Sequence, residues 1–255
     1  MAKIVAVANQ KGGVAKTTTV LSLGVALAEA GRRTLVVDLD PQACLTYSLG
    51  LDPDTLESSL HDVLVRRAKV ADVTHPVQGV DRLSLTPATI DLAGAEVHLL
   101  GRTGREHVLR RALEPVTSDY DLVLIDCPPS LGVLTINGLT AADGVLVPMQ
   151  CEVLSHRGVG QLLETVDDVR TFANAGLSVL GIVPTMFDGR TRHGRQVLEA
   201  VGGYGLRVLE PPVPRSVRFA ESAGTGRSLL QSAPDSPGAR AYRALAGQLA
   251  DLVAA

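Results

Sequence analysis

The segment NQKGGVAKTTT, residues 9–19, decides how the chain is expected to fold. Lys16 followed by Thr17 is the pair that closes a phosphate-binding loop, where the lysine contacts phosphate oxygens and the hydroxyl binds Mg²⁺. The strict pattern G-x-x-x-x-G-K-[ST] fails twice, because Gln10 and Ala15 stand at its glycine positions. The segment therefore predicts phosphate binding but leaves open a plain glycine turn capped by a threonine. It also leaves one of its two lysines unexplained.

Apolar, β-branched runs alternate with helix-like segments on either side of this loop. The predicted strands are residues 3–8, 34–38, 82–86, 122–126, 144–148, 179–184 and 207–209. The predicted helices are residues 17–30, 92–113, 156–173, 195–201 and 239–253. Several strands are apolar without alternation, as in parallel sheets buried on both faces. We predict one α/β domain over residues 1–255, with a doubly wound, mostly parallel sheet and helices on both faces. Residues 50–80 show no regular pattern.

Composition indicates a globular protein that stays in the cytoplasm. The 255 residues are 45% hydrophobic and 20% charged. No apolar run reaches the roughly 18 residues of a membrane span, and Asn9 interrupts the first apolar stretch too early for a secretory signal. Cys44, Cys127 and Cys151 are odd in number and form no C-x-x-C pair. We interpret them as reduced, mostly buried thiols rather than as disulfides or zinc ligands.

Charge is unevenly distributed along the chain. The net charge of −3 by itself argues against a nucleic-acid partner. Residues 188–227, however, contain seven arginines and four acidic residues. This asymmetry points to a surface in the last third of the chain that faces a polyanion.

Carboxylates follow two of the predicted strands. LVVDLDPQ, residues 35–42, carries Asp38 and Asp40, and YDLVLIDCPPS, residues 120–130, carries Asp126. Asp126 has the position of an aspartate that holds the Mg²⁺ of a bound nucleotide. Each aspartate taken alone could simply cap a turn. Because the loop and both segments place polar groups at carboxyl ends of strands, the sequence favours a nucleotide site there.

Taken together, the motifs resemble one family. KGGVAKTT resembles the deviant Walker A motif K-G-G-x-x-K-[ST] of the ParA/MinD ATPases. The segments that resemble its chromosome and plasmid partition (ParA, Soj-like) branch are DLDPQ, LIDCPPS, TMFDGRT, PVPRSVRFAESAGTG and APDSPGARAYRALA. The resemblance covers nearly the whole chain and implies a P-loop NTPase fold with ATP and Mg²⁺ as cofactors.

The resemblance also implies roles for individual residues. In catalysis, Lys11 reaches across a face-to-face dimer to the partner's ATP, and Asp40 orients the attacking water. The nucleotide-binding residues it implies are Lys11, Gly12, Gly13, Val14, Ala15, Lys16, Thr17, Thr18, Thr185, Met186, Pro212 and Pro214. The residues it places at the metal are Thr17, Asp38 and Asp126. The residues it places on DNA are Arg190, Arg215 and Arg218.

The function implied by the resemblance is an ATP-dependent switch. An ATP-bound homodimer binds double-stranded DNA non-specifically, associates with the nucleoid, and leaves it when a ParB-like protein stimulates hydrolysis. A MinD-like membrane switch needs a basic amphipathic C-terminus, yet no Lys or Arg follows Arg243. An iron–sulfur ATPase needs paired cysteines with suitable spacing, and Cys127, which directly follows Asp126, does not have that spacing. A switch that positions protein clusters and a weakly hydrolysing ATP-bound scaffold stay open, the latter because Ala15 replaces a glycine common in relatives.

Overall fold

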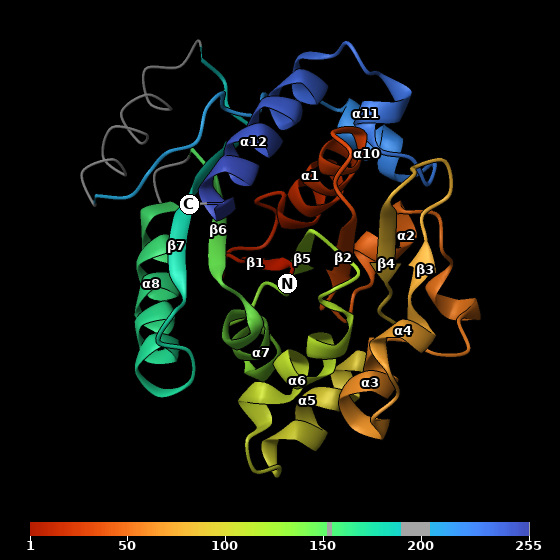
Figure 1. Cartoon of the computed structure of the whole chain (residues 1–255). Coiled ribbons are helices and arrows are strands. Elements are labelled where there is room, and N and C mark those ends of the chain that lie inside the picture. Colours follow the sequence, from red (N-terminus) through yellow and green to blue (C-terminus); the bar gives the residue numbers. More distant parts are fainter. Residues whose placement is uncertain (152–154, 190–204, 255) are drawn as a thin grey trace.

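One seven-stranded sheet forms the centre of a computed structural model that describes residues 1–151, 155–189 and 205–254 (Figure 1). Its strands are β1 (Lys3–Val7), β2 (Thr34–Asp38), β3 (His75–Pro76), β4 (Leu83–Thr86), β5 (Leu122–Asp126), β6 (Gly144–Gln150) and β7 (Ser178–Thr185). They stand in the order β3-β4-β2-β5-β1-β6-β7, and every pair is parallel except β3 with β4. The predicted doubly wound, mostly parallel sheet is confirmed.

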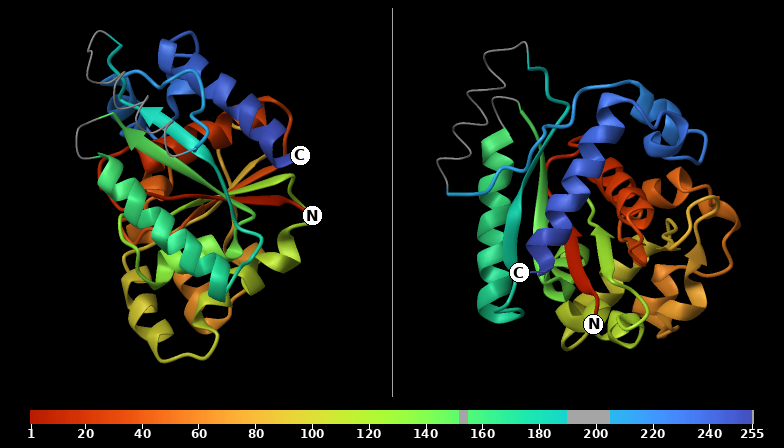
Figure 2. Two further views of the ribbon diagram at one scale, coloured as in Figure 1. Left: turned by 90° about the vertical axis from the view of Figure 1, so that its left-hand side faces the viewer. Right: turned by 45° about the horizontal axis from the view of Figure 1, so that its top comes forward.

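Helices cover both faces of the sheet (Figure 2). The helices of one face are α3 (Leu60–Arg66), α5 (Leu92–Leu100), α6 (Val108–Leu113), α7 (Val133–Ala141) and α8 (Ser155–Phe172). Those of the other face are α1 (Lys16–Glu29), α2 (Cys44–Ser48), α11 (Leu229–Ser232) and α12 (Pro237–Ala254). In β1, Ile4 and Ala6 enter one core while Val5 and Val7 enter the other. Burial on both faces explains why the strands lack polar alternation.

Shorter elements fill the connections. They are α4 (Val70–Val73), α10 (Arg218–Ala223) and the 3₁₀ turns η1 (Pro53–Thr55), η2 (Arg105–His107) and η3 (Glu114–Val116). The stretch 50–80 that showed no pattern contains η1, α3, α4 and strand β3. There α3 begins with a capping box, in which Ser59 and Asp62 bond each other's backbone N–H groups. No helix in the described ranges is both long and apolar enough to cross a membrane.

Two predicted elements are wrong in extent. The predicted helix 92–113 is interrupted after Leu100, because the chain turns through Gly104 at φ 66° before η2 and α6 begin. The predicted strand 207–209 contributes one parallel bridge, between Val208 and Ile182, and no strand of its own. The predicted helix 195–201 lies outside the described residues.

Candidate nucleotide-binding site

The loop between β1 and α1 presents an open helix N-terminus. Gly13 and Ala15 both have left-handed backbone, with φ of 73° and 67°. Ala15 is the N-cap of α1, and among the described residues no side chain caps this helix and no acidic residue occupies its first turn. The first N–H groups of a helix lack partners within it and carry partial positive charge. The loop is therefore built to receive an anion such as phosphate.

The side chains of Lys16 and Asn9 hold the backbone of this loop in place. Lys16 is buried, and its Nζ donates to the Lys11 carbonyl at 3.3 Å. Burial lowers the pKa of Lys16, while the neighbouring Asp126 opposes that shift. Asn9, also buried, donates from Nδ2 to the Pro148 carbonyl at 2.8 Å and accepts the Lys11 N–H on Oδ1 at 3.0 Å. Asn9 was not predicted as a site residue, since nothing but its place before Lys11 distinguished it.

Asp126 has the environment of a cation ligand. It ends β5 directly beside Val7 of β1 and Asp38 of β2. The carboxylate is buried, and neither oxygen accepts a well-formed hydrogen bond from the described residues. Burial, and then the charge of Asp38, hold the pKa of Asp126 well above its usual range, although the Thr17 hydroxyl beside it favours the charged form. A bound cation would satisfy these oxygens and restore the charge, so the residues fit Mg²⁺.

Asp38 has different contacts although it occupies the same level of the sheet. Its Oδ2 accepts the N–H and hydroxyl of Thr46 at 2.8 and 2.7 Å, and its Oδ1 accepts the Asp40 N–H at 3.2 Å. Burial raises the pKa of Asp38 to about 6. These bonds attach Asp38 to α2, which is the capping role that the sequence left open. Its place at the metal stays a prediction.

Asp40 differs from both buried aspartates because it is half-exposed. Its Oδ1 accepts the Gln42 N–H at 2.9 Å, and this bond orients the carboxylate. Its charge also acts on the buried Lys16. Asp40 is therefore near enough to the loop for the predicted role in orienting water, and that role stays a prediction.

A cavity of about 280 Å³ adjoins the loop. The predicted nucleotide-binding residues that line it are Ala15, Thr18, Thr185, Met186 and Pro214. Pro212 is not among the lining residues. Thr185 is buried and donates to the Val14 carbonyl at 2.9 Å, which ties the end of β7 to the loop. Phe219 and Tyr242 complete the wall, and neither was predicted as a site residue. Aromatic residues make up only 3% of the chain, and this scarcity is a signal that could have drawn attention to them.

The predicted DNA-binding arginines lie close to this cavity. Arg215 and Arg218 are exposed, and Arg215 itself lines the cavity. Arg190 lies outside the described residues.

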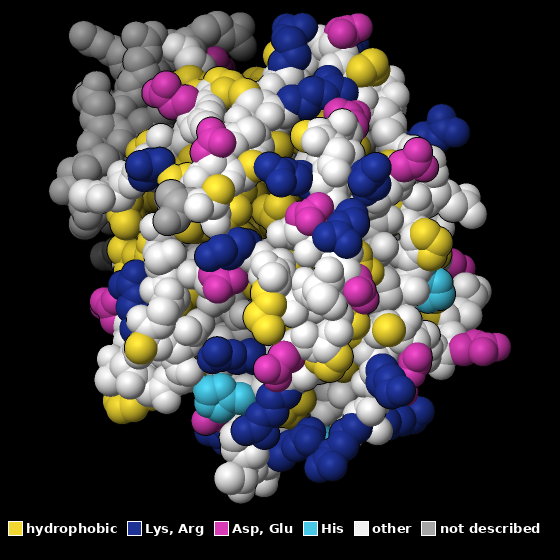
Figure 3. All heavy atoms as spheres, viewed as in Figure 1, with side chains coloured by type: hydrophobic (Ala, Val, Ile, Leu, Met, Phe, Trp, Pro, Cys, Tyr) yellow, Lys and Arg dark blue, Asp and Glu magenta, His cyan; other side chains and the backbone are white. Residues whose placement is uncertain are grey.

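A second basic surface lies along the lower edge of the molecule, over α5 and α6 (Figure 3). Exposed basic residues in this part of the chain are Arg66, Arg67 and Lys69, at the end of α3 and after it, and Arg105, Arg110 and Arg111, in η2 and α6. They were not predicted from the sequence, because acidic residues elsewhere between positions 60 and 115 balance their charge. We refer to this surface as the lower arginine edge.

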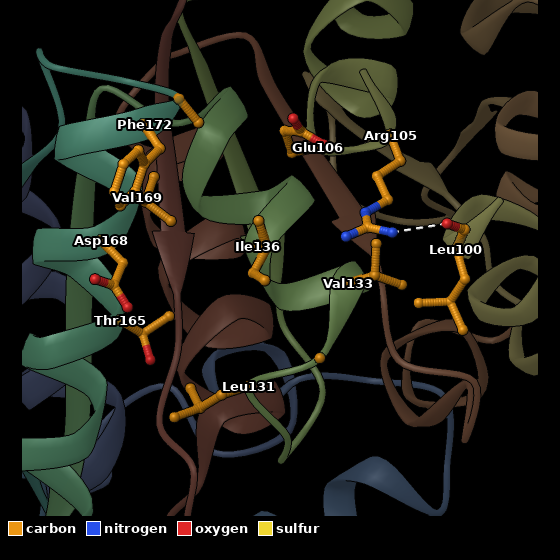
Figure 4. Close-up of a pocket in the computed structure, with 12 residues that line it drawn as sticks. Leu100, Arg105, Glu106, Leu131, Val133, Ile136, Thr165, Asp168, Val169 and Phe172 are labelled. Carbon is orange, nitrogen blue, oxygen red and sulfur yellow. Dashed lines mark hydrogen bonds between the residues drawn. The ribbon is translucent and has the colours of Figure 1, made fainter. Parts of the chain in front are cut away.

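Another cavity, of about 440 Å³, lies between α7 and α8 (Figure 4). Ile136 of α7 and Val169 of α8 line it, Phe172 stands exposed at its rim, and Arg105 donates to the Leu100 carbonyl at 2.7 Å beside it. None of the predicted site residues lines this cavity. It is separate from the nucleotide site.

Comparison with known proteins places the chain in a family. A family model described as an AAA domain matches residues 2–179. The sporulation initiation inhibitor protein Soj of Bacillus subtilis is 46% identical over 251 residues, which cover 98% of this chain and 99% of that protein. The chromosome-partitioning ATPase Soj of Thermus thermophilus is 45% identical, with 96% and 94% covered. The chain belongs to the ParA/MinD family of ATPases.

Solved structures agree with membership of the ParA/MinD family. A Mycobacterium smegmatis protein described as cobyrinic acid a,c-diamide synthase, with bound ADP and magnesium, is 53% identical with a TM-score of 0.86. The alignment covers 98% of this chain and 94% of that one. The cell division ATPase MinD of Pyrococcus furiosus is 27% identical with a TM-score of 0.80, covering 99% and 100%. Within the family, the Soj relatives place this chain in the Soj-like branch.

Proposed function

We propose that this ParA/MinD ATPase partitions DNA. Its ATP-bound homodimer binds double-stranded DNA without sequence preference, associates with the nucleoid in the cytoplasm, and leaves the DNA on hydrolysis stimulated by a ParB-like protein. The observation that carries the nucleotide half is Asp126, a buried carboxylate without a good hydrogen-bond donor among the described residues, beside Lys16 and an open helix N-terminus. The chromosome-partitioning Soj relative supports the cargo.

Each side chain has a distinct task in the proposed reaction. The N–H groups at the start of α1 and the Lys16 ammonium hold the phosphates. Thr17 and Asp126 would hold Mg²⁺, and Asp38 would lie close to the metal. When bound, Mg²⁺ supplies positive charge that neutralises the phosphate oxygens. Asp40 orients the attacking water. We expect nucleotide and water to supply the remaining ligands.

The second subunit completes the site and the DNA surface. Lys11 reaches the partner's nucleotide and stabilises the charge that develops on the transferred phosphoryl group. Arg215 and Arg218, together with Arg190, contact DNA phosphates from both subunits. Dimerisation therefore joins two arginine surfaces, and hydrolysis separates them.

The proposed function is tested by measuring DNA affinity across a salt series, with ATP and with ADP. When a protein binds DNA phosphates, the plot of log affinity against log salt concentration has a negative slope of about 0.9 for each phosphate neutralised. Arg218→Ala should flatten this slope by up to about two in the ATP state, because a dimer presents each arginine twice. Arg110→Ala, on the lower arginine edge, is the matched control and should leave the slope unchanged. Equal affinity in both nucleotide states, or an unchanged Arg218→Ala slope, would overturn the proposal.

The description of the M. smegmatis structure suggests a second candidate, amide synthesis. An enzyme that takes ammonia from glutamine with a cysteine nucleophile needs a reactive thiolate. The prediction that the three thiols of this chain are mostly buried is wrong for Cys44, which is exposed, whereas Cys127 is buried and Cys151 is half-buried. Loss of hydration nevertheless raises the pKa of each thiol, that of Cys151 to about 11. We therefore expect no glutamine hydrolysis by the purified protein with ATP and cobyrinic acid, and ammonia release would support this candidate instead.

A further inference from the structure

A chain of hydroxyl groups runs from the C-terminal helix to the phosphate loop. Tyr242 of α12 is completely buried, and its hydroxyl lies 3.0 Å from Thr19 Oγ1. Thr19 Oγ1 in turn donates to the Ala15 carbonyl at 2.7 Å. Because a hydroxyl group has a single hydrogen, Tyr242 must be the donor to Thr19. The chain ends on Ala15, the left-handed N-cap whose conformation aims the first N–H groups of α1.

The ring of Tyr242 contacts a second element. It meets the ring of Phe219 edge to face, with centroids 5.8 Å apart and planes at 90°. Phe219 belongs to α10 and directly follows Arg218 in the chain. Gly238 of α12 makes this approach possible, since a Cβ there would lie 2.7 Å from Phe219 Cζ. Tyr242 thus touches both the loop and the helix that begins with a predicted DNA contact.

Both aromatic rings also line the cavity beside the loop. Its remaining wall includes Pro214 and Arg215, so one cavity borders the loop, α12 and the segment 213–223. Burial raises the pKa of Tyr242 further above neutral pH, so the hydroxyl is protonated and available as a donor. A nucleotide base in this cavity would lie beside both the loop and the arginine-bearing segment.

We propose that Tyr242 is a positioning residue that couples the nucleotide to the DNA-binding arginines. Its hydroxyl holds the Ala15 carbonyl through Thr19 and so shapes the phosphate loop. Its ring holds Phe219, and therefore α10 and Arg218, against the wall of the nucleotide cavity. The DNA half of this inference rests on the proposed function, whereas the loop half requires only that nucleotide binds.

The loop half is tested by removing single hydroxyl groups. Tyr242→Phe keeps the ring and should weaken ADP binding about fivefold, the fold-change expected for one hydrogen bond. KM for ATP should rise with little change in kcat, because a preformed loop binds ground and transition states alike. Thr19→Val should behave similarly and Thr19→Ser should resemble the wild type. Tyr47→Phe, at a tyrosine that is 56% exposed, is the matched control. Calorimetry with ADP gives a readout that does not depend on turnover.

The DNA half is tested by removing the ring. Tyr242→Leu at saturating ATP should bring the ratio of DNA affinities with ATP and ADP close to one, while Tyr242→Phe should preserve this ratio. Circular dichroism and thermal unfolding establish that the variants fold. If Tyr242→Leu does not fold, Phe219→Leu removes the same ring contact from the other side.

The outcomes separate the inference from the proposed function. Unchanged ADP affinity in both Tyr242→Phe and Thr19→Val would overturn the loop half. A wild-type ATP to ADP ratio in Tyr242→Leu and Phe219→Leu would overturn the coupling. If the wild-type protein itself binds DNA equally in both states, the proposed function and the coupling fail together, while ADP affinity still decides the loop half.

Discussion

Asp126 and Asp38 end neighbouring strands at the same level of the sheet, yet only Asp38 is satisfied by hydrogen bonds from the described residues. Both are aspartates at strand ends, and the family resemblance placed both at the metal. What separates them is Thr46, eight residues beyond Asp38, whose backbone and hydroxyl both bond that carboxylate. The contact between Asp38 and Thr46 depends on how the chain folds after β2, which the apolar pattern of the strands does not reveal. The sequence predicted which carboxylates meet, but not which one lacks partners.

This difference predicts how stability depends on pH. The folded-state pKa of Asp126 is raised above its unfolded value, so its contribution to stability is present below the unfolded pKa and is lost as pH rises through the folded pKa. Asp126→Asn removes this titration. In EDTA, the variant's free energy of unfolding should exceed that of the wild type increasingly from pH 4.5 to 7.5, by about 1.4 kcal/mol for each pH unit between the unfolded and folded pKa values of Asp126. Urea unfolding at both pH values measures it.

Nucleotide should reverse that order. With Mg²⁺ and ADP, the wild type should be stabilised in proportion to its affinity, while Asp126→Asn should gain little because one metal ligand is lost. The control is Asp119→Asn, which removes an exposed carboxylate shortly before the same strand. A difference between variant and wild type that does not grow with pH would show that Asp126 is already charged and stabilised without a cation.

At the scale of elements, the sequence predicted strands better than helices. Six strands were located because each is a short apolar run buried on both faces. Helix α7 was missed for a related reason: seven of its nine residues are buried, so it shows no amphipathic period. The predicted helix 92–113 continued through Gly101 and Gly104, where apolar spacing persisted but the backbone turned. Helix patterns therefore failed where burial was complete or where glycine changed the direction of the chain.

The packing of α12 predicts opposite effects for two glycines in one helix. A Cβ at Gly238 would lie within 3.0 Å of Phe219 and Leu229 side-chain atoms, whereas nothing lies within 4 Å of one at Gly247. Gly247→Ala should raise the free energy of unfolding by about 0.5–1 kcal/mol, through helix propensity alone. Gly238→Ala should lower it by about 1–3 kcal/mol because it forces α10 and α11 away from α12. Urea unfolding of both variants checks the signs, and stabilisation by Gly238→Ala would mean that these helices do not pack closely.

At the scale of the whole molecule, nucleotide and DNA surfaces share one edge because of the chain that follows β7. This chain returns alongside β7 through bridges from Val208 to Ile182 and from Pro214 to Phe187. It thereby carries Arg215 to the cavity and leads directly into α10. The motifs of both surfaces could be recognised in the sequence, but their adjacency depends on described residues 205–217, which form two isolated bridges and no regular strand. The contact between Phe219 and Tyr242 could not be predicted either, because these residues are far apart in the sequence.

The unexplained lysine of the loop yields a prediction about the assembly. The backbone of Lys11 is held on both sides, since its N–H bonds Asn9 and its carbonyl accepts from Lys16 Nζ. Lys11→Ala keeps these backbone bonds, so the loop should retain most of its affinity for nucleotide. If the Lys11 side chain bridges subunits, the variant should stay monomeric with ATP and Mg²⁺, while the wild type dimerises.

Light scattering gives the mass in each nucleotide state, and calorimetry gives nucleotide affinity. Lys16→Ala is the contrasting variant: it removes the buried ammonium at the phosphates and should lose nucleotide binding and dimer together. Loss of the dimer in Lys11→Ala with binding retained would separate the two lysines by role, one serving its own subunit and the other its partner. A Lys11→Ala protein that still dimerises with ATP would show that the interface forms without this charge. The role of Lys11 would then lie within its own subunit.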